Sequence, residues 1–210
     1  MSRELVLHEI RRAIAGAAGL RGRSQLPQRP QPPSYGDRRI DRFTERLEAH
    51  ACSWEAIGGL DELPARVLAW LEQRGLARRM AVAPPLMELP WPEGVHRHAG
   101  AAGIDESVAV SLAFAGIAES GSLVMYSGPN SPITHNFVPE FHLVAIRDED
   151  VSDSQEGIWA KVRAHGGMPR ALNLIAGPSR TGDVEQTIQL GAHGPRQVHV
   201  LLVRAKGVTS

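Results

Sequence analysis

Cysteine is nearly absent from this chain of 210 residues, which holds Cys52 alone. One thiol excludes an intrachain disulfide framework, and it cannot supply the ligands of an iron–sulfur cluster or a four-cysteine zinc site within one chain. A surplus of either charge is also missing, because Lys+Arg and Asp+Glu both number 23. A formal net charge of zero lacks the basic footprint of nucleic-acid-binding proteins, so we expect no nucleic-acid partner.

Long apolar runs are missing too. No run approaches the roughly 20 residues that a membrane helix needs, and the N-terminal stretch lacks the apolar core of a signal peptide. We therefore expect a cytoplasmic protein without a membrane span. The length of 210 residues suffices for one sizeable domain with its own core.

The N-terminal third is expected to be helical and is interrupted by a linker. Leu7, Ile10 and Ile14 repeat at helical spacing, which predicts an amphipathic helix over the first 17 or so residues. Residues 19–36 are rich in Pro, Gly, Arg and Gln and have little to bury, so they are interpreted as an extended linker. Two more helices are predicted around 40–47 and 63–71. The predicted division is 1–36, an N-terminal helix and Pro-rich linker, and 37–210, an α/β domain.

Strand patterns dominate from residue 78 onward. Short or apolar stretches predict strands at 78–85, 141–148, 171–177 and 196–205, and the small apolar residues of 107–129 are typical of strands buried on both faces. A helix is expected within 151–167, with a capping box formed by Ser152 and Gln155 or by Asp153 and Glu156. Strands that alternate with helices predict an α/β fold with a mostly parallel sheet flanked by helices.

The polar stretch 175–195 lies between two predicted strands and draws attention as a ligand site. Ligands of parallel α/β sheets bind beyond the carboxyl ends of strands, and a short helix starting near Asp183 would add free amide donors for a carboxylate or phosphate. The alternative is a purely structural role, in which Asp183 and Glu185 cap that helix and pair with Arg180. A serine nucleophile is not expected, because Gly182 comes one residue too late for the Gly-x-Ser-x-Gly elbow. The candidate ligand-binding residues are Gly177, Ser179, Arg180, Thr181, Asp183, Glu185, His193 and Gly194.

Glu119 is the candidate catalytic residue, because it stands at a glycine-flanked turn inside an apolar stretch. A buried carboxylate is costly unless it is paired or its pKa is raised, which is typical of a nucleophile or base. The alternative is a structural acid bonded to backbone amides. No metal-ligand spacing such as HExxH is present, so no metal site is predicted. If a metal is bound, His135, His142 and His193 form the set to test, and we expect them to converge near Glu119.

Several motifs in fixed order resemble the lactate utilization protein C family, which carries the LUD domain. They are "AGIAESGSLV" at 115–124, "HNFVPEFHLVAI" at 135–146, "IAGPSRTGDVEQTIQLGAHGP" at 175–195 and "VHVLLV" at 198–203. The order and spacing match from about residue 100 to 205. Ser120, Gly182, Val184 and Ala192 are mild departures from the family pattern.

The resemblance implies a fold like that of the NagB/RpiA/CoA-transferase group. It also implies a role in oxidising L-lactate to pyruvate with iron–sulfur partner proteins, which would carry the clusters, so this chain is expected to hold no cofactor. The chain would be a non-redox subunit that binds a small anionic ligand. Two alternatives stay open. One is a stand-alone enzyme of CoA-transferase or sugar-phosphate isomerase type using Glu119, since "AESG" is similar in form to a CoA-transferase motif. The other is a scaffold protein.

Overall fold

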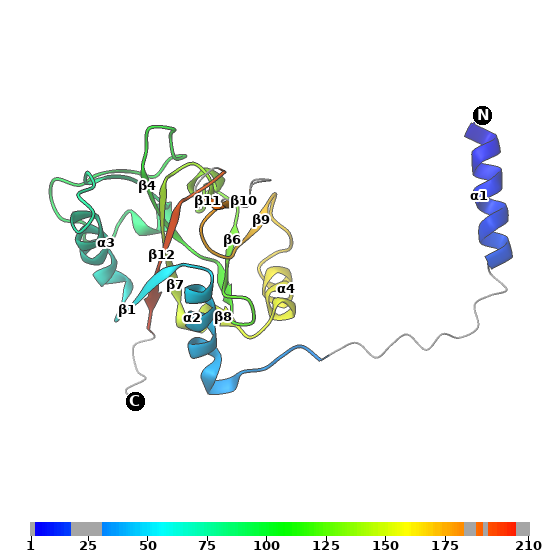
Figure 1. The fold of residues 1–210 in the computed structure, drawn as a ribbon, viewed down its shortest axis with the longest axis horizontal. Coiled ribbons are helices and arrows are strands. Elements are labelled where there is room, and N and C mark those ends of the chain that lie inside the picture. The colour runs from blue at the N-terminus through cyan, green and yellow to red at the C-terminus, as the bar shows by residue number, and fades with distance from the viewer. Residues whose placement is uncertain (1–2, 18–30, 183–187, 191–192, 205–210) are drawn as a thin grey trace. The chain divides into compact units, whose positions relative to one another are not determined.

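The computed structural model describes residues 3–17, 31–182, 188–190 and 193–204. Its contacts divide the chain into two units, Met1–Pro32 and Pro33–Ser210. The first unit carries the helix α1, Arg3–Ala17, which confirms the helix predicted at the N-terminus (Figure 1). Its apolar side chains, including Leu7, Ile10 and Ile14, are exposed to solvent.

A six-stranded sheet forms the centre of the second unit, with the strand order β1-β12-β7-β4-β2-β3 (Figure 1). Every neighbouring pair in this sheet is parallel. The predicted α/β class with a mostly parallel sheet flanked by helices is confirmed. The strands are β1 Ser53–Ile57, β2 Arg79–Val82, β3 His96–His98, β4 Val108–Leu112, β7 Phe141–Arg147 and β12 Gln197–Val203.

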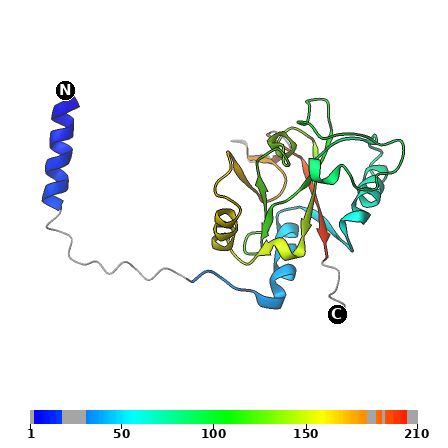
Figure 2. The same cartoon turned by 180° about the vertical axis from the view of Figure 1, so that it is seen from behind.

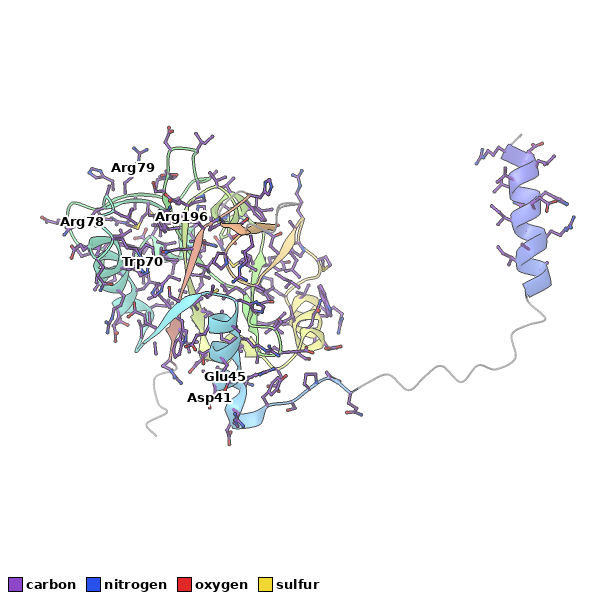
Figure 3. The ribbon with its side chains drawn as sticks, viewed as in Figure 1. Asp41, Glu45, Trp70, Arg78, Arg79 and Arg196 are labelled. Atoms are coloured by element: carbon purple, nitrogen blue, oxygen red, sulfur yellow. The ribbon has the colours of Figure 1, made fainter. Side chains whose placement is uncertain are left out.

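Both faces of this sheet are buried, because alternate residues of each strand point to opposite sides. On β7, Leu143 packs in a core with the helix α3, Leu63–Glu72, whereas Val144 packs in a core with the helix α2, Arg39–Ala49. Trp70 of α3 meets the ring of Phe141 edge-on, with ring centroids 5.5 Å apart (Figure 3). The two helices therefore cover opposite faces of the sheet.

A second, mixed sheet lies beside the first and has the order β8-β5-β6-β9. The helix α4 packs against it through Ile158 and Val162, and the turn between β5 and β6 lies against α2 (Figure 2). Gly121 in that turn has a φ of +67°, and a Cβ there would lie 2.6 Å from Cβ of Arg46, so the turn needs glycine. The elements are β5 Ala115–Ile117, β6 Ser122–Tyr126, β8 Val151–Ser152, β9 Leu172–Ile175 and α4 Gln155–Ala164.

One local prediction differs from the structure, and another, the short helix starting near Asp183, falls outside the described residues. The helix α4 begins after Ser154, and no side chain caps its amino end, so the predicted capping box is wrong. The segment after Gly177 is a strand, β10 Arg180–Gly182, which pairs antiparallel with β11 Ile188–Leu190. Asp183 lies outside the described residues.

In the part of the second unit that the structure describes, short 3₁₀ helices occupy five connections. Within the described residues, none of the helices has the length and apolar character that crossing a membrane requires. The 3₁₀ helices are Gly36–Arg38, Leu60–Glu62, Pro84–Leu86, Ile133–Asn136 and Asp148–Asp150.

Candidate functional site

Three of the sequence motifs come together in the folded chain. The amide of Ser179 donates a hydrogen bond of 2.8 Å to the carbonyl oxygen of Pro195. A Cβ on Gly194 would lie 3.4 Å from Cβ of Ser179 and 4.0 Å from the carbonyl oxygen of Asn136. The segments around His135, Ser179 and Gly194 therefore contact one another, although they are up to 60 residues apart in sequence.

This motif cluster lies at the amino edge of the parallel sheet, where β4, β7 and β12 begin. We expected the carboxyl edge, and that prediction is wrong. The reason is that β9, which leads into Gly177, belongs to the mixed sheet and runs antiparallel to β6. A cavity of about 580 Å³ opens at the amino edge. It is lined by Ile104, Asp105, Glu106, Ser107, Phe137, Val138, Pro139, Glu140, His193, Gly194 and Arg196.

A chain of hydrogen bonds links the 3₁₀ helix that carries His135 to β4 and β7. Nε2 of His135 lies 3.0 Å from the carbonyl oxygen of Gly100, which can only accept, so Nε2 carries the proton. Nδ1 of His135 then accepts from the hydroxyl of Ser111, 3.4 Å away. The same hydroxyl oxygen accepts from Nε2 of His142 at 3.0 Å. This order leaves Nδ1 of His142 as an acceptor, and no partner reaches it among the described residues.

Burial keeps both of these histidines neutral. Desolvation, and to a smaller extent the neighbouring His135, lowers the pKa of His142 to about 3. Desolvation also lowers the pKa of His135, against the opposing effect of its bond to Gly100. A neutral imidazole donates through one nitrogen and accepts through the other, which is what the chain through Ser111 requires.

Glu106 is a buried carboxylate at the rim of the cavity that the sequence patterns did not single out. It accepts a hydrogen bond of 2.8 Å from the amide of Gly103 and pairs with Nε2 of His98. Burial raises the pKa of Glu106, but the bonds from Gly103 and His98 outweigh it and hold the pKa below its usual value. Only its place just before a strand of small apolar residues could have indicated it.

Glu119 occupies an exposed turn, so the prediction of a buried carboxylate is wrong. The chain reverses between β5 and β6 at the surface, and the side chain of Glu119 reaches solvent. Its amide donates to the carbonyl oxygen of Asp153 at 3.0 Å. Glu119 lines neither the cavity of about 580 Å³ nor the cleft at the carboxyl edge described below.

The predicted anion donors of 177–181 are already engaged. The amide of Ser179 is bonded to Pro195, as described above, and Thr181 belongs to the paired strand β10. Arg180 is exposed, and its guanidinium donates to the carbonyl oxygen of His50 at 3.0 Å. The amide of Ser179 is therefore not free for an anion, and the helix start near Asp183 that would supply free amides lies outside the described residues. Asp183 and Glu185 lie outside the described residues.

The three histidines considered for a metal do not share a ligand geometry. Both ring nitrogens of His135 are hydrogen-bonded, His142 is fully buried, and His193 is exposed at the cavity. Within the described residues, no group of three or more His, Cys, Asp or Glu side chains is arranged to hold a metal ion. His135 and His142 converge through Ser111 and not through a common ligand position.

The architecture defines an α/β domain with a six-stranded parallel sheet and a smaller mixed sheet beside it. Residues 93–203 match the model of the LUD domain, so the chain belongs to the LUD domain family.

Known proteins similar to this chain differ in how much of it they match. Lactate utilization protein C of Deinococcus radiodurans is 28% identical over 211 residues, covering 94% of this chain and 93% of that protein. Others of that name match 56% and 48% of the chain. An uncharacterized protein of Neisseria meningitidis is 34% identical over 89 residues, and the match spans only 38% of its length.

One solved structure supports the fold. It is a DUF162 family protein from Deinococcus radiodurans, with a TM-score of 0.59 and 19% sequence identity. The likeness covers 81% of this chain and 99% of that one.

Proposed function

We propose that this chain is a non-redox component of an L-lactate utilization system and works with iron–sulfur partner proteins. The observation that carries the proposal is the LUD domain match over 93–203, together with the relatives named lactate utilization protein C. One of these relatives aligns with 94% of the chain, so the likeness extends beyond the domain itself.

The state of Cys52 supports a non-redox role. The side chain is 5% exposed, and burial raises the pKa of its thiol to about 11, against the opposing effect of Arg180. Iron and zinc bind the thiolate, which is scarce at neutral pH when the pKa is that high. We infer that clusters needed for electron transfer belong to the partner proteins.

A small anionic ligand, a carboxylate or phosphate, is part of the proposal. The cavity at the motif cluster offers His193 and Arg196, but Arg196 is paired with Glu140. Asp105 and Glu106 also line the cavity and would repel an anion. The charge around this cavity therefore disfavours an anion there, so the proposed anionic ligand would bind elsewhere on the domain.

The alternative enzyme using Glu119 gains no support from the exposed position of that side chain. A nucleophile or base needs a substrate held beside it in a defined geometry. The scaffold alternative makes a different prediction from the proposal. It predicts that changes at Glu119 and Arg180 affect stability alone.

Growth on L-lactate tests the proposal. A strain of the source organism that lacks the gene is expected to grow normally on glucose and poorly on L-lactate, and the intact gene should restore growth. Complementation with Glu119→Gln and Arg180→Ala, alongside thermal unfolding of the purified variants, separates function from stability. Normal growth of the deletion strain on L-lactate would overturn the proposal. Full growth with Glu119→Gln would remove the alternative enzyme.

A further inference from the structure

A cleft of about 340 Å³ opens at the carboxyl edge of the parallel sheet, on the opposite edge from the motif cluster. Its lining residues come from the carboxyl ends of β2 and β4, from the mixed sheet and from α4, so it lies between the two sheets and that helix. Its lining residues are Pro85, Leu112, Ala113, Phe114, Tyr126, Asn130, Ser131, Arg147, Asp150, Lys161 and His165.

The strand order of the parallel sheet places this cleft where the direction of winding changes. From β2 the chain moves outward to β3, then returns to the other side of β2 and continues through β4, β7 and β12 in the opposite direction. The direction of winding therefore reverses between β2 and β4. Open α/β sheets bind their ligands outside the carboxyl ends of the strands at such a switch point.

One wall of the cleft is aromatic. The rings of Phe114, Tyr126 and His165 lie 5.0–5.1 Å apart between centroids, in tilted and edge-on contacts. Phe114 and Tyr126 also pack on the core formed by the mixed sheet and α4. The hydroxyl of Tyr126 donates to the carbonyl oxygen of Gly167 at 3.0 Å, which fixes that ring. The wall is therefore rigid before a ligand arrives.

The lining of this cleft has a net charge opposite in sign to that of the cavity at the motif cluster. Arg147 and Lys161 both line the cleft and share a single carboxylate, Asp150. Nη1 of Arg147 lies 3.8 Å from Oδ2 of Asp150, and Lys161 pairs with Oδ1. Nζ of Lys161 also lies 5.2 Å from the ring centre of Phe114. The lining thus carries one positive charge in excess, directly beside an aromatic face.

We propose that this cleft binds a ligand of mononucleotide size that joins a flat ring to an anionic group. The ring would contact the wall of Phe114, Tyr126 and His165, and the anion would pair with Lys161 and Arg147. A volume of about 340 Å³ is near the lower end of the range for small-molecule sites, which suits a mononucleotide better than a dinucleotide. This site goes beyond the proposed role in lactate utilization and does not depend on it.

Calorimetric titration of the full chain tests the proposal directly. AMP, GMP, CMP and UMP serve as probes, with adenosine and ribose 5-phosphate as the two halves of AMP. At least one nucleoside monophosphate is expected to bind with a Kd below about 1 mM, and each half at least about tenfold more weakly. No binding of any of the four nucleotides would overturn the proposal. Binding of ribose 5-phosphate as tight as that of AMP would overturn the role of the ring.

Paired variants assign the binding to this cleft. Lys161→Gln is expected to weaken nucleotide binding about tenfold through loss of a charge-assisted bond. Arg163→Gln is the control, because Arg163 is an exposed cation on the same helix that does not line the cleft. Equal affinity in the two variants would overturn the assignment.

A second pair of variants tests the aromatic wall. Phe114→Leu is expected to weaken binding by about fivefold or more, because stacking on the ring is lost. Phe137→Leu makes the same change at an exposed phenylalanine that does not line this cleft, so it should bind the nucleotide as the parent does. If Phe114→Leu fails to fold, Lys161→Gln still decides the proposal. A folded Phe114→Leu variant with parental affinity would contradict it.

Discussion

Replacing His142 by glutamine is expected to remove part of the protein's sensitivity to acid. His142 is fully buried, and its Nε2 donates to the hydroxyl of Ser111 at 3.0 Å. The side-chain amide of glutamine can donate to the same hydroxyl but does not titrate. The substitution therefore separates the proton equilibrium of the imidazole from its hydrogen bond.

The magnitude follows from the pKa of His142, which burial lowers from 6.5 to about 3. Between pH 6.5 and pH 3, His142 binds a proton in the unfolded chain but not in the folded chain. The free energy of unfolding therefore falls as the pH falls through this range. The contribution is complete above pH 6.5 and is lost progressively toward pH 3. Between pH 7 and pH 5 the loss from this one group comes to about 2 kcal/mol.

Urea unfolding of the parent and of His142→Gln at several pH values between 7 and 5 measures this difference. The parent is expected to lose about 2 kcal/mol more than the variant over that range. His135 and His199 also have lowered pKa values, but both proteins retain them, so their contributions cancel in the comparison. Equal losses in parent and variant would refute the neutral, buried state of His142.

Three further predictions concern other parts of the domain. Gly177→Ala should destabilise the protein by about 1–3 kcal/mol more than Gly166→Ala in denaturant unfolding, because both have positive φ but only a Cβ at Gly177 would overlap the carbonyl oxygen of His50. Similar losses would contradict the close packing. Cys52 should react slowly with a thiol reagent at pH 8 until the protein unfolds, since burial raises its pKa to about 11, and rapid labelling of the folded chain would contradict this. Glu119→Gln should change thermal stability by less than about 0.5 kcal/mol, as expected of an exposed side chain, and a larger loss would indicate a structural role.

The main sheet could be predicted because its strands leave a local signal. The apolar run that forms β7 and the closing run that forms β12 are buried on both faces, so almost every residue is apolar. The helix α2 shows its buried residues Phe43 and Leu47 at helical spacing. These elements were predicted with nearly the observed bounds.

The mixed sheet could not be predicted in the same way, because pairing between distant segments leaves no local pattern. The residues of β9 look like one more strand of a parallel sheet, but they pair antiparallel with β6 through Leu123 and Ile175. The strand β1 was missed because it lies at the edge of the sheet and buries only Ile57 fully. The place of β9 in the mixed sheet decides which edge of the parallel sheet the motifs reach.

The residues of the candidate sites, like the strands, could be predicted only where they leave a local sequence signal. The motifs led to His135, Ser179 and Gly194, which the fold brings together. They did not lead to Ser111, because one serine in a strand of small residues carries no signal of its own. The aromatic wall from Phe114 to His165 spans about fifty residues and forms only when α4 packs on the mixed sheet.

Reconstitution of lactate oxidation tests the central claim most directly. The iron–sulfur lactate-utilization proteins of the same organism would be purified with and without this chain, and pyruvate formation from L-lactate would be measured. The account predicts no turnover by the chain alone, slow turnover by the partners alone and fast turnover by the mixture. Turnover by the chain alone, or a full rate from the partners without it, would contradict a role as a non-redox component of the system.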